Sequence, residues 1–268
     1  MEYVVGFLIA LFIALTGVGA GTITVPILVL FLNVPAAIAV SIGLMFSAAV
    51  KLILLPVHIV RGTISWRTLG WMLLGGIPGV LVGSLLLRQL VNAGSQDVLN
   101  ALLGIILITT AGWQLFSFFR PVRERVGQPD RSKVLPWLML PVGAEVGFSS
   151  AGAGALGSAA LLSLTPLAPT AVIGTDIAFG FTMSLIGSGA HLLAHGSDMG
   201  LLLRLITGGA FGAIAGTLLS GLIPHRPLRV ALWVWLLLLG GQFLSHSYSA
   251  QTVHARQHEL STSPQHSR

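Results

Sequence analysis

The stretch TGVGAGTITVP, residues 16–26, decides how this sequence folds. It lies in a run without charged residues between Glu2 and Lys51, which is apolar enough to sit in lipid, yet glycine and proline disfavour a helix. Non-helical backbone at membrane depth is costly unless it is buried in protein or lines a water-filled cavity. We therefore expect the break to have a function.

Composition places the chain in a membrane. Of its 268 residues, 54% are hydrophobic and 8% are charged, whereas about a quarter of the residues in a soluble domain are charged. The net charge of +6 does not indicate nucleic-acid binding, because Lys and Arg occur singly between apolar runs. Cysteine is absent, which excludes thiolate metal sites and cysteine nucleophiles. No cofactor is expected.

The uncharged lengths predict an all-α polytopic protein with about eight transmembrane helices, since a span takes roughly 20 apolar residues. Two spans are expected in 3–50, one each in 68–87 and 98–119, two in 134–197, and one each in 205–225 and 230–246. The predicted units are a four-helix repeat (1–119), a basic cytoplasmic linker (120–133), a second four-helix repeat (134–246) and a disordered cytoplasmic tail (247–268).

The two halves resemble each other at an offset of 133 residues. The ladder Gly75, Gly79 and Gly83 recurs as Gly208, Gly212 and Gly216. The same offset relates Gly19 to Gly152, Gly21 to Gly154 and His58 to His191. These coincidences indicate an internal duplication, and small-residue ladders allow close helix packing.

Loop charges predict the topology, because Lys and Arg collect on the cytoplasmic side. With eight spans, one face holds 10 of these residues, including the five of the linker, and the other holds 3. We therefore expect a cell (inner) membrane protein with both termini and the linker in the cytoplasm, and parallel repeats. If each half instead began with a re-entrant hairpin, the repeats would be inverted.

The glycine-rich break also occurs in both halves, as GVGAG near the start and as SAGAGALG at residues 150–157. One interpretation is a kink or close packing through small residues. We favour a pair of discontinuous helices, whose N–H groups and positive dipole ends face an anion near the bilayer midplane.

No enzyme is predicted. The segment GAGALG, residues 152–157, matches G-x-G-x-x-G but lacks the strand and the βαβ unit that a dinucleotide site requires. Ser188 and His191 lack the nucleophile turn of a serine hydrolase. No Walker motif is present, so the chain has no ATP motor of its own.

Ionisable residues inside a membrane are costly and by default functional. Lys51 shares a helix face with Ser47 and His58, and its alternative role is a lysine that extends to the interface. Glu145 and Asp176 could carry a proton or pair with a cation, and Asp176 could instead cap or pack against the broken backbone.

His191 and His195 have the i, i+4 spacing of a two-histidine metal site. A third ligand could come only from Asp176 or Glu145, so we expect no metal site.

At these motifs the chain resembles the sulfite exporter TauE/SafE family of membrane permeases. The resemblance rests on GVGAGTITVP, its looser second copy, and the steps Val40-Ser41 and Gly174-Thr175-Asp176, and it covers most of residues 5–245. Ala159 or Ala160 stands where the first copy has Pro26. The resemblance implies export or uptake of small anions such as sulfite, sulfonates or related organosulfur compounds.

We therefore expect a secondary transporter of a small oxyanion, monomeric or homodimeric, driven by an ion or proton gradient. The predicted substrate-binding residues are Gly19, Gly21, Thr22, Ser41, Lys51, Gly152, Gly154 and Thr175. The coupling candidates are His58, His191, Asp176 and Glu145. The second hypothesis is a metal-cation transporter that uses His191, His195, Asp176 and Glu145. A cation site would need both acids to face one cavity, whereas an anion site needs donors without converging carboxylates.

Overall fold

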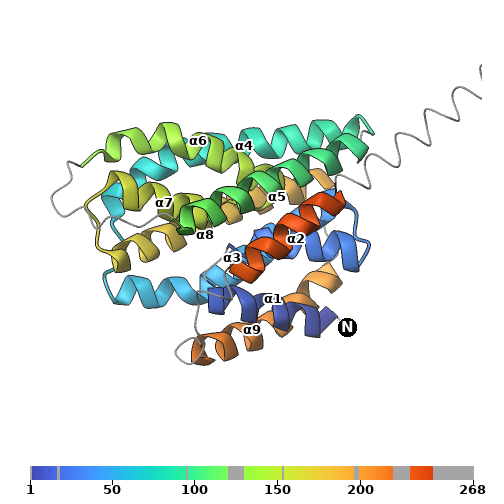
Figure 1. The fold of residues 1–268 in the computed structure, drawn as a ribbon, viewed down its shortest axis with the longest axis horizontal. Helices are drawn as coiled ribbons and strands as arrows, with labels where there is room; N and C mark the ends of the chain where they lie inside the picture. Colours follow the sequence, from blue (N-terminus) through green and yellow to red (C-terminus); the bar gives the residue numbers. More distant parts are fainter. Residues whose placement is uncertain are drawn as a thin grey trace, which may run out of the picture.

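The structure is a computed structural model that describes residues 2–16, 19–94, 96–119, 130–152, 154–195, 199–219 and 230–243. Within these residues it is helical without β-strands, which confirms the predicted all-α class (Figure 1). The helices are α1 (Glu2–Thr16), α2 (Ala20–Phe31), α3 (Ala36–Val60), α4 (Trp66–Asn92), α5 (Gln96–Phe119), η1 (Ser132–Val134), α6 (Leu135–Ser149), α7 (Ala155–Leu164), α8 (Pro169–His195) and α9 (Met199–Leu219). A further helical segment is Val230–Phe243.

Five helices of the described part are long and apolar enough to cross a membrane, and they lie in α3, α4, α5, α8 and α9. The helices α1, α2, α6 and α7 have only 15, 12, 15 and 10 residues. Because a helix needs roughly 20 residues to span about 30 Å, none of these four can cross the bilayer alone. The described residues therefore contain five candidate spans in place of the expected eight.

The chain doubles back at each glycine-rich break. Residues 3–50, expected to hold two spans, form α1, α2 and the first part of α3, and residues 134–197 form α6, α7 and α8 in the same way. Each half thus begins with a pair of short helices followed by long ones (Figure 1). The length of an uncharged run sets how many helical residues it can contain, but it does not show where the chain reverses direction. Two full spans were therefore expected in each run.

The glycine face of α4 packs on α6. A Cβ atom added at Gly75, Gly79 or Gly83 would overlap with a carbonyl oxygen of α6, belonging respectively to Pro136, Leu140 and Ala144. Because the contacted residues advance together along both helices, α4 and α6 are parallel. Glycine is required here by the close approach of the two backbones.

The second glycine ladder allows α9 to pack closely on α1. A Cβ atom added at Gly208, Gly212 or Gly216 would meet the backbone of Tyr3, Phe7 and Leu11 respectively. Adding 133 to Gly75 gives Gly208, and subtracting 133 from Pro136 gives Tyr3, and the other two pairs follow the same rule. The offset seen in the sequence therefore relates packing contacts as well as residue types.

The helices α3 and α8 are antiparallel, which differs from the expected arrangement. Going along α8, Gly180 and then Gly187 pack against Lys51 and then Leu44 of α3. These two helices are equivalent under the 133-residue offset, and parallel repeats would hold equivalent helices parallel. The expectation of parallel repeats is therefore wrong, because the equivalent long helices α3 and α8 run in opposite directions.

The positions of the helix ends agree with the antiparallel arrangement of α3 and α8. Figure 1 places the end of α5 and the start of α6, which flank the linker, at the end of the molecule opposite to the N-terminus. The segment Val230–Phe243, drawn in red, ends on the same side as the N-terminus. The linker and the N-terminus were expected on one face, whereas the described helix ends that flank the linker lie opposite to the start of α1.

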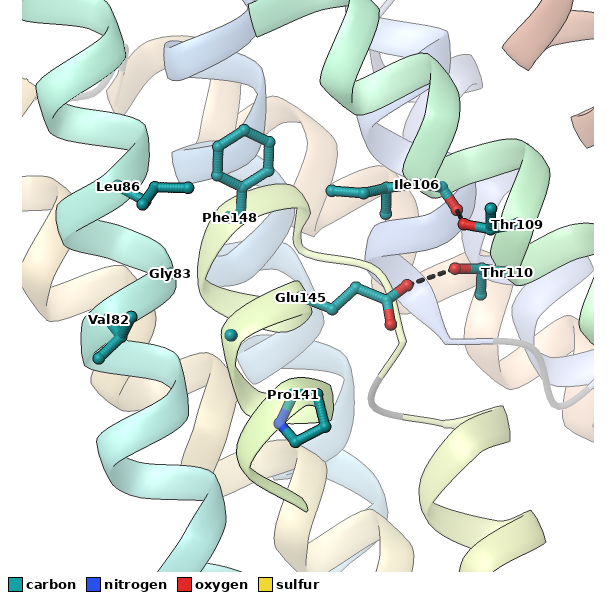
Figure 2. Close-up of a pocket in the computed structure, with 10 residues that line it drawn as sticks. Val82, Gly83, Leu86, Ile106, Thr109, Thr110, Pro141, Glu145 and Phe148 are labelled. Carbon is teal, nitrogen blue, oxygen red and sulfur yellow. Dashed lines mark hydrogen bonds between the residues drawn. The ribbon is translucent and has the colours of Figure 1, made fainter. Parts of the chain in front are cut away.

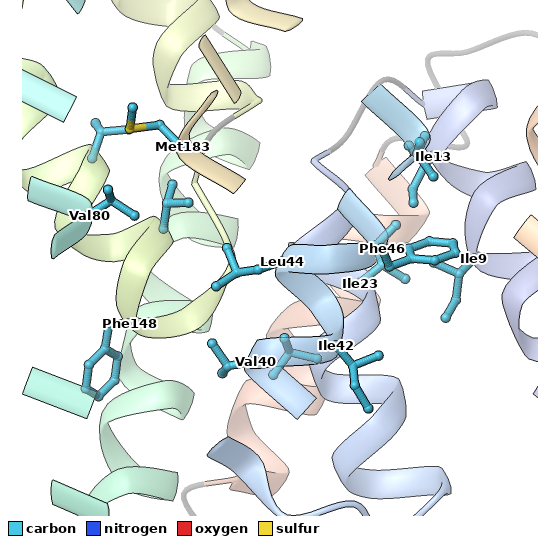
Figure 3. Close-up of a cluster of buried hydrophobic side chains, with 14 of the residues drawn as sticks. Ile9, Ile13, Ile23, Val40, Ile42, Leu44, Phe46, Val80, Phe148 and Met183 are labelled. Atoms are coloured by element: carbon cyan, nitrogen blue, oxygen red, sulfur yellow. The ribbon is translucent and has the colours of Figure 1, made fainter. Parts of the chain in front are cut away.

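The helix α3 lies between two parts of the apolar core. Figure 3 shows Leu44 directed toward Val80 and Met183, whereas Phe46 is directed toward Ile9 and Ile23. Side chains of α3 thus contact both the α4 and α8 side and the α1 and α2 side. The polar residues Ser41, Ser47 and Lys51 of this helix are therefore buried inside the protein.

Glycine packing can be tested on one helix. Gly79→Ala should lower thermal stability by about 1–3 kcal/mol, because its Cβ would overlap with the Leu140 carbonyl, and Gly212→Ala should behave alike. Gly70→Ala is the matched control on α4, since no atom lies within 4 Å of its added Cβ, and it should be neutral or stabilising by up to about 1 kcal/mol. Thermal unfolding of the detergent-solubilised protein measures all three. Equal effects of Gly79→Ala and Gly70→Ala would contradict the packing role.

Candidate functional site

The two helix breaks meet each other. Gly19 is the N-cap of α2 and Gly154 is the N-cap of α7. A Cβ atom on Gly19 would lie 3.5 Å from the backbone nitrogen of Gly154 and 3.5 Å from Oγ1 of Thr22. The first turns of two short helices therefore begin side by side, and N-terminal turns carry N–H groups without intrahelical partners and a partial positive charge.

The other two predicted glycines have different neighbours. Gly21, in the first turn of α2, packs directly against Ser150, because an added Cβ would overlap with the carbonyl and hydroxyl oxygens of that residue. Gly152 has a φ of +86° and lies beside the Glu145 carboxyl group, whose Cδ would be 2.9 Å from an added Cβ. Gly21 thus lies at the meeting point of the breaks, whereas Gly152 packs against Glu145.

Lys51 is buried between α3 and α8, with 9% of its surface exposed. Its Nζ donates a hydrogen bond of 2.8 Å to Oγ of Ser47 and a longer one of 3.5 Å to Oγ of Ser184. The Ser184 hydroxyl in turn donates to Ser47 at 3.1 Å. Gly180 makes room for the ammonium group, since an added Cβ would lie 2.8 Å from Nζ. The side chain is held inside the helix pair and does not extend to the interface.

Asp176 lies one helical turn before Gly180 on α8 and is 6% exposed. Its Oδ2 accepts a hydrogen bond of 2.8 Å from Ser158, whereas Oδ1 has no hydrogen-bond partner. Oδ1 lies against Gly157 in the first turn of α7. The Asp176 carboxylate therefore sits where a helix N-terminus favours negative charge.

The two buried charges attract each other without touching. Asp176 and Lys51 interact electrostatically, yet they form no ion pair with each other, unlike Arg204 and Glu2, which pair at 2.8 Å on the surface. The Lys51 ammonium group has donors, and the Asp176 carboxylate has an acceptor oxygen, that the neighbouring serine hydroxyls do not use.

Two predicted hydroxyl donors are engaged within the fold. The Ser41 hydroxyl donates to the carbonyl of Ala37 at 3.2 Å, inside its own helix. The Thr175 hydroxyl accepts the backbone N–H of Ser65 at 2.9 Å and so joins α8 to the start of α4. Neither contact reaches the Lys51 cluster.

The histidines lie apart from Lys51 as well. His58 approaches Thr63 near the end of α3, with Nδ1 and Oγ1 2.9 Å apart. Nε2 of His191 lies 2.8 Å from the carbonyl oxygen of Gly147, which links α8 to α6. The side chain of His195 is outside the described residues.

Glu145 faces a cavity of about 330 Å³ between α4, α5 and α6. Figure 2 shows its carboxylate accepting a hydrogen bond from the Thr110 hydroxyl of α5. Asp176 does not line this cavity, so the two acids do not face one space. Within the described residues, no group of three His, Asp or Glu side chains could hold a metal ion. The cation-transporter hypothesis is not supported.

Sequence reasoning missed the serines that complete the cluster. Ser184 and Ser158 contact the two buried charges, and Ser150 lies at the meeting point of the breaks. One signal was available, because the 133-residue offset takes Lys51 to Ser184. Serine is common in apolar helices, so its identity alone did not select these positions.

Comparison with known proteins places the chain in a family. The sequence model of the family described as "Sulfite exporter TauE/SafE" matches residues 3–243. A relative from Bacillus subtilis (strain 168), "Probable membrane transporter protein YjnA", is 27% identical over 236 residues, which cover 84% of this chain and 91% of that protein. No solved structure matches the chain significantly. The family match spans both doubled-back helix pairs and the α3 and α8 cluster, and the chain belongs to the sulfite exporter TauE/SafE family of membrane transporters.

Proposed function

We propose that this protein is a secondary transporter of a small oxyanion, namely sulfite, a sulfonate or a related organosulfur anion. The observation that carries the proposal is the environment of Lys51, whose hydrogen bonds go to two neutral serine hydroxyls. A charge inside a membrane protein is expensive and needs a partner. An anion from solution supplies that partner when it binds.

Asp176 does not remove this need. Its carboxylate lies beside the first turn of α7 and accepts from Ser158, so it attracts Lys51 from a distance without forming an ion pair. The ammonium group has three donors, and an oxyanion with several acceptor oxygens can accept from it and from neighbouring hydroxyls together.

The substrate class comes from the family and agrees with the donors. The family description names sulfite, and sulfite and sulfonates present negatively charged oxygens to Lys51 and to the N-terminal turns of α2 and α7. Helix ends directed at an anionic substrate near the midplane are a recurring design in secondary transporters.

Asp176 is the best of the four coupling candidates. Its charge acts on Lys51, whereas His58 interacts with Thr63, His191 with Gly147 and Glu145 with Thr110. Protonation of Asp176 would remove a competing negative charge and strengthen the attraction of Lys51 for an anion. Transport is therefore coupled to a proton or ion gradient through this residue.

The two halves form inverted repeats in the cell membrane, with the linker in the cytoplasm and both termini outside. In the sequence, nine Lys and Arg residues lie in or next to the segments that join α3 to α4, α5 to α6 and α9 to Val230–Phe243, namely Arg61, Arg67, the five linker cations, Arg226 and Arg229. Four others, namely Arg88, Arg204, Arg256 and Arg268, lie in the sequence near or beyond the opposite helix ends. The positive-inside rule then assigns the linker side to the cytoplasm. This orientation replaces the cytoplasmic termini expected from eight spans.

Lys51 gives the first test. Lys51→Gln should weaken sulfite transport by roughly 10-fold or more, because a hydrogen bond to a charged group contributes about 1.5–3 kcal/mol. Lys51→Arg keeps the charge and should lose less. Flux into liposomes at matched protein content measures both.

The control is Arg204→Gln, which removes a cation from the surface pair with Glu2 and should transport normally. If Lys51→Gln transports sulfite as the wild type does, the buried ammonium is not the anion's partner and the proposal fails.

Topology gives the second test. A reporter inserted near Gln128 in the linker should be cytoplasmic, and reporters at Gly94 and after Ser245 should be outside, because an odd number of crossings separates the linker from each of them. Green fluorescent protein and alkaline phosphatase fusions read the two sides. Linker and tail reporters on the same side would contradict inverted repeats.

A further inference from the structure

Ser150 combines two unfavourable features. Its backbone is left-handed, with a φ of 62°, a conformation that glycine adopts freely and serine rarely does. Its hydroxyl is buried, with the residue 5% exposed, and has no hydrogen-bond partner. Glycine at this position would remove both costs, so a purely structural role does not explain serine.

The unpartnered hydroxyl lies at the first turn of α2. An added Cβ on Gly21, the second residue of that helix, would overlap with Oγ of Ser150. On the other side, a Cβ on Gly43 of α3 would lie 3.1 Å from the same oxygen. The hydroxyl is thus enclosed between the start of α2 and a glycine of α3.

The equivalent place in the second half is already filled by a carboxylate. The 133-residue offset takes Gly43 to Asp176 and Val25 to Ser158, and Asp176 lies beside the first turn of α7 with Ser158 as its donor. The corresponding residues of the first half are Gly43 and Val25, and a Cβ atom added at Gly43 would lie 2.9 Å from Cγ2 of Val25. The α2 end therefore has no carboxylate from these positions.

We propose that Ser150 is a substrate-binding residue, whose hydroxyl donates to an oxyanion held at the first turn of α2 in the place that Asp176 occupies at the first turn of α7. This inference rests on the proposed function and narrows it to one of the two helix ends. Ser150 packs directly on Gly21, so the anion enters when these two segments move apart.

Sulfite binding by the purified full-length protein tests the inference. Ser150→Gly should keep or raise the melting temperature without ligand, because it relieves the left-handed backbone, and should raise the Kd for sulfite about 10-fold or more through loss of a donor to a charged group. Ser150→Ala should show a similar rise in Kd. Sulfite under nitrogen is the probe, and the ligand-induced shift in melting temperature is the readout.

Ser149→Ala is the matched control, one residue away. The Ser149 hydroxyl donates to the Glu145 carbonyl at 2.9 Å and accepts from the N–H of Ala151 at 3.2 Å. Its loss should lower stability and leave the Kd for sulfite unchanged. If Ser150→Gly and Ser150→Ala bind sulfite with the wild-type Kd while Lys51→Gln does not, the inference is overturned and the proposed function stands. If the wild type does not bind sulfite or a sulfonate, both fail.

A graft provides an independent measurement. The double variant Gly43→Asp with Val25→Ser rebuilds at α2 the pair that Asp176 and Ser158 form at α7. It should fold and lose the sulfite-induced shift, because a tethered carboxylate then occupies the anion's place. The neutral pair Gly43→Asn with Val25→Ser is the control and should retain more of the shift. A Gly43→Asp graft that folds and binds sulfite at the wild-type Kd would overturn the assignment to α2, and the Ser150 variants decide the matter should the graft not fold.

Discussion

The antiparallel contact between α3 and α8 buries a lysine and an aspartate in a chain that lipid surrounds, and the remaining helices make this burial possible. Neither charge could stay at this depth against hydrocarbon. The long helices α4 and α9 pack beside the pair, and the glycine ladders let α6 and α1 approach them closely enough to close the protein around it. The short helices α2 and α7 then direct their N-terminal turns at the same region. Close backbone packing thus encloses these polar groups within the protein.

Much of this architecture was predictable, because it depends on residue type and spacing. Composition identified the membrane, and the offset of 133 residues that relates the two glycine ladders also relates their contacts in the structure, such as Gly75 on Pro136 and Gly208 on Tyr3. The number of crossings was not predictable from hydropathy. A run of apolar residues is equally compatible with lipid whether it forms two spans or a doubled-back pair followed by one span. The doubled-back pair forms only where other helices bury the non-helical backbone of its turn.

Some residues of the candidate site were likewise predictable from the sequence, and others were not. Lys51 was selected because a charge inside an apolar run is conspicuous, and the structure surrounds it with polar groups. Ser41 and Thr175 were also selected, yet their hydroxyls bond within the fold, since a sequence does not say whether a hydroxyl faces its own helix or a neighbour. Ser150 escaped notice because its left-handed backbone and unpartnered oxygen exist only in three dimensions.

The differences between the two halves explain how a nearly symmetric scaffold could bind one ligand. Under the proposed inverted repeat, exchanging the conformations of the halves would convert an inward-facing into an outward-facing state of similar energy. A ligand shifts such an equilibrium only through different contacts in the two states. Lys51, where the second half has Ser184, and Asp176, where the first half has Gly43, make the two halves chemically unequal. An anion at the first turn of α2 would then face hydrogen-bond donors, whereas the first turn of α7 already faces the Asp176 carboxylate. Anion binding and protonation of Asp176 therefore take place at the two different helix ends.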